Sequence, residues 1–98
     1  MSLTLSVNVT DDDIFQGEPG ECDTCPIALA IERAAEKISR RGDWVHAEVF
    51  TEHAWLRIGP NRYRASLPQS VQDFIGRYDN ALPAEPFEVT LLWESDPL

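Results

Sequence analysis

The chain has 98 residues, of which 43% are hydrophobic, and it carries a formal net charge of −9 at pH 7. This length predicts one domain, residues 1–98, because the chain can build only one hydrophobic core. No stretch reaches the ~18 apolar residues of a membrane-spanning helix, and residues 1–9 lack the basic start and apolar run of a signal peptide. We therefore expect a cytoplasmic protein without a membrane partner, and its acidity disfavours binding to duplex nucleic acid.

The first part of the chain predicts a strand and two helices. Residues 3–9 alternate apolar and polar side chains, which is typical of a strand with one buried face. Thr10 and the three aspartates after it predict the N-cap and first turn of a short helix. These aspartates lack the ligand spacing of a calcium loop, so capping is the favoured interpretation. Residues 26–41 carry the strongest helical periodicity, with Pro26 at the start and Gly42 after the end.

The second part of the chain predicts a meander, a helix and a last strand. Alternation with a period of two predicts three antiparallel strands between Trp44 and Leu67, with a turn at residues 59–61. An amphipathic helix follows near residues 68–79, and residues 87–93 alternate again. The order strand, helix, three strands, helix, strand predicts an α+β fold: a mixed, mostly antiparallel five-strand sheet with two helices on one face.

Cys22 and Cys25 form a C-x-x-C pair just before the long helix, and one interpretation is thiol redox chemistry. A helix N-terminus lowers the pKa of a thiol and so favours the reactive thiolate. Here Pro26 places the helix start after the second cysteine. The acidic neighbours Glu21 and Asp23 also oppose thiolate formation.

Two other interpretations of the cysteine pair remain. A C-x-x-C pair is half of a zinc ligand set, which His46 and His53 would have to complete. Their odd spacing predicts side chains on opposite faces, so this weakly supported metal site through Cys22 and Cys25 ranks below a structural role. In that favoured interpretation Cys25 caps the helix or fills a small buried gap. We accordingly expect no metal and no cofactor.

Aromatic and arginine side chains recur on one predicted face of the meander. This aromatic–arginine face consists of Trp44, Phe50, Trp55, Arg57, Arg62 and Arg64. Packing within the chain is the first interpretation, because arginine stacks on neighbouring rings. Protein binding comes second, because these residue types anchor interfaces. Binding to single-stranded nucleic acid comes third, because of the negative net charge.

Three further runs of the sequence can be compared with known proteins: C-P-I-A-L-A-I from Cys25, L-P-Q-S-V-Q-D-F-I-G-R-Y-D from Leu67, and P-F-E-V from Pro86. Together they resemble small uncharacterised proteins of actinobacterial phages and related genomes. These motifs specify packing, and the resemblance implies no known activity. The chain also lacks a nucleophile elbow and a glycine-rich phosphate loop, so we expect no enzyme.

The leading functional hypothesis is a non-enzymatic accessory protein that acts by protein binding. The contact would be the aromatic–arginine face or the acidic surface at residues 11–23. In one variant of this hypothesis, the acidic protein is a decoy that occupies the basic groove of a DNA-binding protein. Self-association of the chain is a further option. The alternative is a cysteine-dependent role in thiol redox chemistry or zinc binding.

Overall fold

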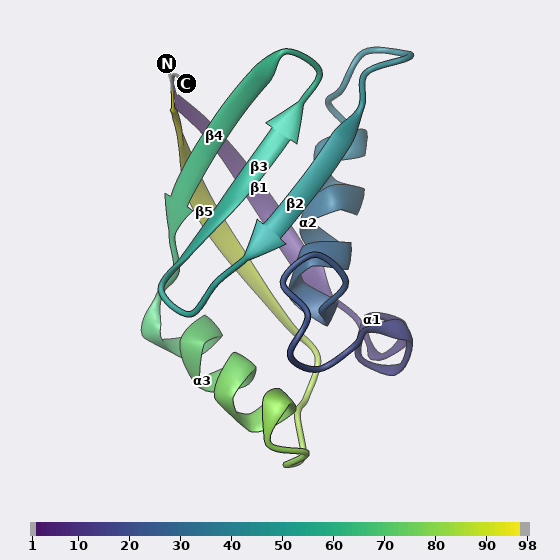
Figure 1. The fold of residues 1–98 in the computed structure, drawn as a ribbon, viewed down its shortest axis with the longest axis vertical. Coiled ribbons are helices and arrows are strands. Elements are labelled where there is room, and N and C mark those ends of the chain that lie inside the picture. The colour runs from purple at the N-terminus through teal and green to yellow at the C-terminus, as the bar shows by residue number, and fades with distance from the viewer. Residues whose placement is uncertain (1, 97–98) are drawn as a thin grey trace.

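The computed structural model describes residues 2–96 and confirms the predicted α+β fold and element order (Figure 1). The strands are β1 (Ser2–Val9), β2 (Val45–Val49), β3 (His53–Ile58), β4 (Asn61–Ser66) and β5 (Phe87–Ser95). The helices are α1 (Asp11–Gln16), α2 (Pro26–Glu36) and α3 (Gln69–Asp79). Within this described range, none of the helices has the length and apolar character needed to cross a membrane.

The five strands form one curled sheet in the order β1-β5-β4-β3-β2, and every neighbouring pair is antiparallel. β1 pairs with β5 along its whole length, from Ser2 to Val9. β4 and β5, in contrast, pair only where Tyr63 and Arg64 lie opposite the end of β5. The sheet therefore consists of the β2–β3–β4 meander and the β1–β5 ribbon, joined near one end and separating toward the other.

The two longer helices close the inner side of this curled sheet. α2 lies against both edge strands, β1 and β2, while α3 lies at the end where β4 and β5 separate (Figure 1). The carboxylate of Glu32 on α2 accepts a hydrogen bond from the Ala47 N–H at 2.9 Å, and the Cys22 carbonyl accepts one from the Val49 N–H at 2.7 Å. These bonds occupy backbone donors of β2 that an edge strand would otherwise leave open.

The apolar side chains predicted to face inward meet in one core. The largest fully buried side chains are those of Trp93, Ile27, Ile31, Leu56, Leu91, Val7, Val9, Val71 and Pro26. They come from β1, β3, β5, α2 and α3, so the alternation in the strands and the periodicity in the helices identified the same interior. Trp93 on β5 is the largest of them and is 0% exposed.

The predicted N-cap of α1 is confirmed, and it includes a buried ion pair. The Thr10 hydroxyl accepts a hydrogen bond from the Asp13 N–H, and the Asp13 carboxylate accepts one from the Thr10 N–H at 2.9 Å. Arg33 on α2 donates to both carboxylate oxygens of Asp13 at 2.7 Å. Asp13 is only 3% exposed, so this bidentate contact fixes α1 to α2 and removes one carboxylate from the expected acidic surface.

The prediction of a helix over residues 26–41 was wrong at its C-terminal end, because α2 ends at Glu36. The Ser39 hydroxyl donates to the Glu36 carbonyl at 3.0 Å, and the Asp43 carboxylate accepts a backbone N–H in the next turn. Short polar side chains of this kind compete with the helical backbone for its hydrogen bonds. Ile38, which the periodicity assigned to the apolar stripe, is 51% exposed as a result.

Candidate aromatic–arginine binding face

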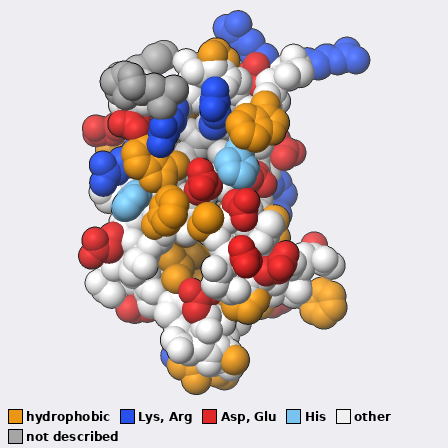
Figure 2. Space-filling model, in the orientation of Figure 1, with side chains coloured by type: hydrophobic (Ala, Val, Ile, Leu, Met, Phe, Trp, Pro, Cys, Tyr) orange, Lys and Arg blue, Asp and Glu red, His pale blue; other side chains and the backbone are white. Residues whose placement is uncertain are grey.

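The meander places the predicted aromatic and arginine side chains on the outer side of the sheet. In β3, Ala54, Leu56 and Ile58 are buried, so the alternate residues Trp55 and Arg57 point outward. Trp44 and Phe50 flank the two ends of β2. Figure 2 shows hydrophobic, cationic and histidine side chains close together over the upper half of this view, with acidic groups beside and below them.

Trp55 is the centre of the face, and two arginines lie over its ring. Trp55 is directly opposite Arg64 in the register of β3 and β4. The guanidinium carbon of Arg62 lies 4.2 Å from the centre of the Trp55 ring, and that of Arg64 lies 5.4 Å away. Both distances are within the range of cation–π attraction. The stacking predicted within the chain is therefore present.

Trp44 forms a second, more exposed aromatic group. Its ring stacks on that of His46 with centroids 5.2 Å apart and planes 4° from parallel, and the Arg57 guanidinium lies 5.7 Å from its centre. Trp44 is still 59% exposed and Phe50 is 40% exposed. Contacts within the chain therefore leave aromatic surface at both ends of β2 available to a partner.

His53 belongs to the same face, which the sequence interpretation missed. Its ring lies 5.4 Å from that of Phe50 and 5.8 Å, edge-on, from that of Trp55. The prediction that His46 and His53 lie on opposite faces was wrong. The turn between β2 and β3 interrupts the inward–outward alternation of side chains. The odd or even number of residues between His46 and His53 therefore does not predict whether they share a face.

The arginines of the face are largely free of carboxylate partners. Within residues 2–96, Arg62 reaches Asp96 at 3.9 Å, whereas neither Arg57 nor Arg64 has a carboxylate within salt-bridge distance. The Arg57 Nε–H donates to the Gly59 carbonyl at 3.4 Å. A shallow pocket of about 330 Å³ lies among these side chains, lined by Trp44, His46, Glu48, Trp55, Leu56, Arg57 and Arg62. The face is thus a local cationic surface on an acidic protein.

Two carboxylates, those of Glu32 and Glu48, lie beside β2 at the edge of the face. His46 lies with Nδ1 3.7 Å from Glu32 Oε2 and with Nε2 4.0 Å from Glu48 Oε1. Burial raises the pKa of Glu32, although the Ala47 N–H and His46 both favour its charged form. The face therefore has a cationic side at β3 and β4 and an acidic side at β2.

Cys25 has the capping role that the sequence interpretation favoured. Cys25 is the N-cap of α2, where its Sγ accepts a hydrogen bond from the Ala28 N–H at 3.4 Å, and it is 9% exposed. Cys22 is half-buried, with its Sγ 3.9 Å from a carboxylate oxygen of Glu48. Burial raises the pKa of both thiols, and the charges of Asp23 and Glu48 raise that of Cys22 further.

Raised pKa values favour protonated thiols, which are poor nucleophiles and poor metal ligands. In the described part of the chain, no group of three or more His, Cys, Asp and Glu side chains is placed to hold a metal ion. The observed geometry thus favours neither the redox nor the zinc interpretation of Cys22 and Cys25.

A comparison of single variants tests this structural role of the cysteines. Cys25→Ala should lower the free energy of unfolding by about 1–2 kcal/mol, because it removes a helix cap and leaves a small void. Cys25→Ser keeps a capping atom and should cost less than Cys25→Ala, while Cys22→Ser should change stability by less than ~0.5 kcal/mol. Urea denaturation under reducing and non-reducing conditions measures both effects. A large loss for Cys22→Ser, or zinc in the purified protein, would contradict this assignment.

Comparison of the chain with protein-family models, with curated proteins and with solved structures found no match. The resemblance to small phage-encoded proteins therefore stays a prediction.

Proposed function

We propose that this protein is a non-enzymatic binding module whose aromatic–arginine face contacts an acidic segment of a partner protein. The observation that carries the proposal is the combination of exposed aromatic rings with arginines that lack carboxylate partners. Tryptophan, tyrosine and arginine are the residue types that most often dominate the free energy of protein interfaces.

The geometry supports a rigid contact surface. Arg62 and Arg64 are held over Trp55, and Trp44 is stacked on His46, so these side chains lose less conformational entropy when a partner binds. Aspartate or glutamate side chains of the partner would pair with Arg57 and Arg64, which have no carboxylate within salt-bridge distance among residues 2–96. Apolar groups beside them would cover the exposed part of Trp44.

A protein partner is favoured over single-stranded nucleic acid on electrostatic grounds. Binding to a phosphate backbone depends on many cationic contacts along the strand. This face offers three arginines, and Glu32 and Glu48 lie on its β2 side around His46. Together with the net charge of −9, these carboxylates would repel a continuous phosphate chain.

The test is affinity capture from the native host followed by mass spectrometry, with the double variant Trp44→Ala/Arg57→Ala as the comparison. Both side chains are exposed, so the variant should fold normally. Loss of two interface anchors should weaken a specific partner about 30-fold or more, which is enough to remove it from the captured set.

The matched control is Lys37→Ala/Leu82→Ala, which also removes one cation and one exposed apolar side chain, away from the face. This control should capture the same partners as the wild-type protein. If the Trp44→Ala/Arg57→Ala protein retains every partner, the proposal fails. It also fails if the wild-type protein binds a single-stranded oligonucleotide through this face and captures no protein.

A further inference from the structure

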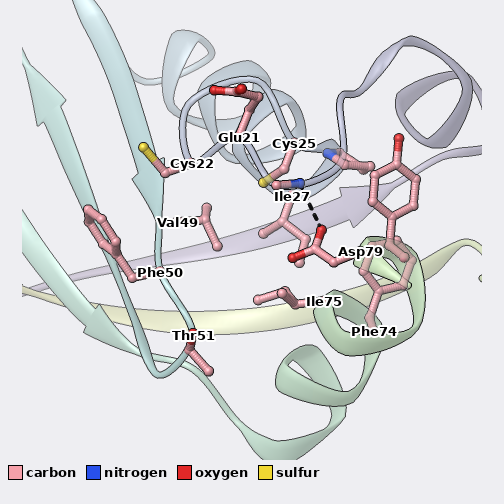
Figure 3. A pocket seen from close by; sticks show the side chains of 13 residues that line it. Glu21, Cys22, Cys25, Ile27, Val49, Phe50, Thr51, Phe74, Ile75 and Asp79 are labelled. Carbon is pink, nitrogen blue, oxygen red and sulfur yellow. Dashed lines mark hydrogen bonds between the residues drawn. The ribbon is translucent and has the colours of Figure 1, made fainter. Parts of the chain in front are cut away.

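A second concave site lies on the acidic part of the molecule, between α2, α3, the end of β2 and the loop before α2. It is a pocket of about 250 Å³ (Figure 3). Its lining residues are Gly20, Glu21, Cys22, Cys25, Pro26, Ile27, Val49, Phe50, Thr51, Phe74, Ile75, Tyr78 and Asp79. We refer to it as the α2–α3 pocket.

Most of the side chains in the walls of the α2–α3 pocket are apolar. Ile27 and Val49 lie deep in the view of Figure 3, with Phe50 on one side and Phe74 and Ile75 on the other. Three of these side chains, Ile27, Val49 and Phe74, also belong to the hydrophobic core, so core packing fixes this part of the walls. The pocket therefore presents a preformed apolar surface to a ligand.

The ring of Tyr78 adds a wall, while its hydroxyl group is held elsewhere. The hydroxyl donates to the Gly17 carbonyl at 2.7 Å and lies 3.0 Å from the carbonyl oxygen of Ile14. These contacts connect α3 to the C-terminal part of α1 and to Gly17 directly after it. The hydroxyl group of Tyr78 is thus hydrogen-bonded to the backbone, and the ring of Tyr78 is the part that lines the pocket.

The charged groups that line the pocket are both carboxylates. Asp79 at the end of α3 accepts a hydrogen bond from the Gly20 N–H at 3.1 Å through one oxygen, which holds the loop against α3 (Figure 3). Glu21 is exposed. Within residues 2–96, neither carboxylate forms a salt bridge with a Lys, Arg or His side chain. An unbalanced negative charge therefore borders an apolar pocket.

The titratable groups of the pocket respond to this negative charge. Burial is the main cause that raises the pKa of Cys22, Cys25 and Tyr78. Neighbouring carboxylates raise all three further: Asp79 acts on Cys25 and Tyr78, while Asp23, Glu48 and, to the smallest extent, Glu21 act on Cys22. These directions agree with the carboxylates at the pocket that are unpaired within residues 2–96, on which the preference for a cation depends.

We propose that the α2–α3 pocket binds a small organic cation, a primary ammonium group attached to one aromatic ring or a short aliphatic group. The volume is slightly below the ~300–1,000 Å³ of pockets for drug-sized ligands, so it suits a single ring. The apolar side chains would cover that ring, and the carboxylate of Asp79 would pair with the ammonium, while Glu21 adds negative charge at the edge of the pocket. Phe50 and Phe74 offer aromatic rings to the same cation.

This site is distinct from the aromatic–arginine face in charge and in position. Phe50 contributes to both, but the carboxylates of the pocket lie on the loop before α2 and on α3 rather than on the meander. The ligand of the pocket is a cation, whereas the proposed partner of the face is acidic. Each proposal can therefore fail without the other.

The test is a titration of the protein with phenethylammonium near neutral pH, followed by two-dimensional amide NMR spectra. Its neutral counterpart 2-phenylethanol is titrated in parallel. Phenethylammonium should shift the amides of the three lining segments, residues 20–27, 49–51 and 74–79. It should bind at least about five-fold more tightly than the alcohol at low ionic strength. This preference should shrink at ~0.5 M NaCl, because salt screens exposed charges.

The variant Glu21→Gln/Asp79→Asn should lower the affinity for phenethylammonium to that for 2-phenylethanol. The amide oxygen of the introduced asparagine would still be able to accept the Gly20 N–H, so the loop should keep its position. The control Glu18→Gln/Glu85→Gln removes the same charge from exposed positions that do not line the pocket, and it should keep the preference. Equal affinity of the wild-type protein for the cation and the alcohol, or shifts confined to residues outside these three segments, would overturn the proposal.

Discussion

The Trp93→Ala protein is expected to lose about 3–5 kcal/mol of its free energy of unfolding. Trp93 is 0% exposed on β5 and is the largest fully buried side chain in the described core. It lies on the strand that joins the β1–β5 ribbon to the meander, so the void would open where the two parts of the sheet meet. A small domain has only about 5–15 kcal/mol of stability in total, and this variant should be close to unfolding.

The variant Trp93→Phe should cost considerably less, about 1–2 kcal/mol. Among residues 2–96, the buried Trp93 indole N–H has no hydrogen-bond partner. A buried N–H group without a partner costs about 1–3 kcal/mol, and phenylalanine removes that cost while it gives up part of the packing. The two effects therefore offset each other.

Urea denaturation with a constant m-value measures both Trp93 variants, because a change in midpoint then reports stability alone. Leu92→Ala is the matched control, since Leu92 is the next residue of β5 and is 54% exposed. It should change stability by less than ~0.5 kcal/mol. If Trp93→Phe is as damaging as Trp93→Ala, the indole N–H must be satisfied in solution.

The second large effect is expected for Asp13→Asn, at about 2–3 kcal/mol of lost stability. Asp13 is buried, and its two carboxylate oxygens accept hydrogen bonds from Arg33 and from the Thr10 N–H. Asparagine can accept only with its single oxygen, and its amide group faces the donors of Arg33. Asp12→Asn is the control, because Asp12 is the exposed neighbour on α1.

This ion pair should also determine part of the pH dependence of stability. Burial alone would raise the pKa of Asp13, but the hydrogen bonds from Arg33 and Thr10 outweigh it and lower the pKa below the usual value. A carboxylate with a lowered pKa in the folded state stabilises the protein above the unfolded pKa of about 3.9. That stabilisation is lost as the pH falls through the lower folded value.

Glu32 works in the opposite direction, because its pKa is raised by burial. Its contribution to stability is present below the unfolded pKa and is lost as the pH rises through the raised folded value. The difference between the wild-type and Asp13→Asn curves isolates Asp13 from this effect. That difference should be constant above about pH 5 and should shrink at lower pH; a difference that grows on acidification would contradict the assignment.

The order of the elements could be predicted from the sequence because alternation and helical periodicity record which side of each segment is buried. The apolar side of β1 and the stripe of α2 were identified in this way, and so was the α1 cap at Thr10. The end of α2 was missed, because Ser39 and Asp43 bond to the local backbone. Such competition depends on three-dimensional geometry that periodicity does not contain.

The candidate sites were only partly predictable, for a related reason. The outer face of the meander follows from the alternation within each strand, and its six predicted residues do lie together or at its ends. The place of His53 depends on a turn, and the partner of Asp13 is 20 residues away on another helix. The α2–α3 pocket combines three segments that are far apart in the chain, and no local pattern links them.

The full-length pairing of β1 with β5 has a consequence for how the protein is made. β1 is the first strand of the domain to leave the ribosome, and its hydrogen-bonding partner is the last. The inward side of β1, with Leu5, Val7 and Val9, therefore stays without its neighbouring strand until synthesis of the domain is nearly complete. Closing a loop of this length is slow compared with forming a local hairpin. β1 is therefore expected to pair with β5 late in folding, after the local hairpins of the meander have formed.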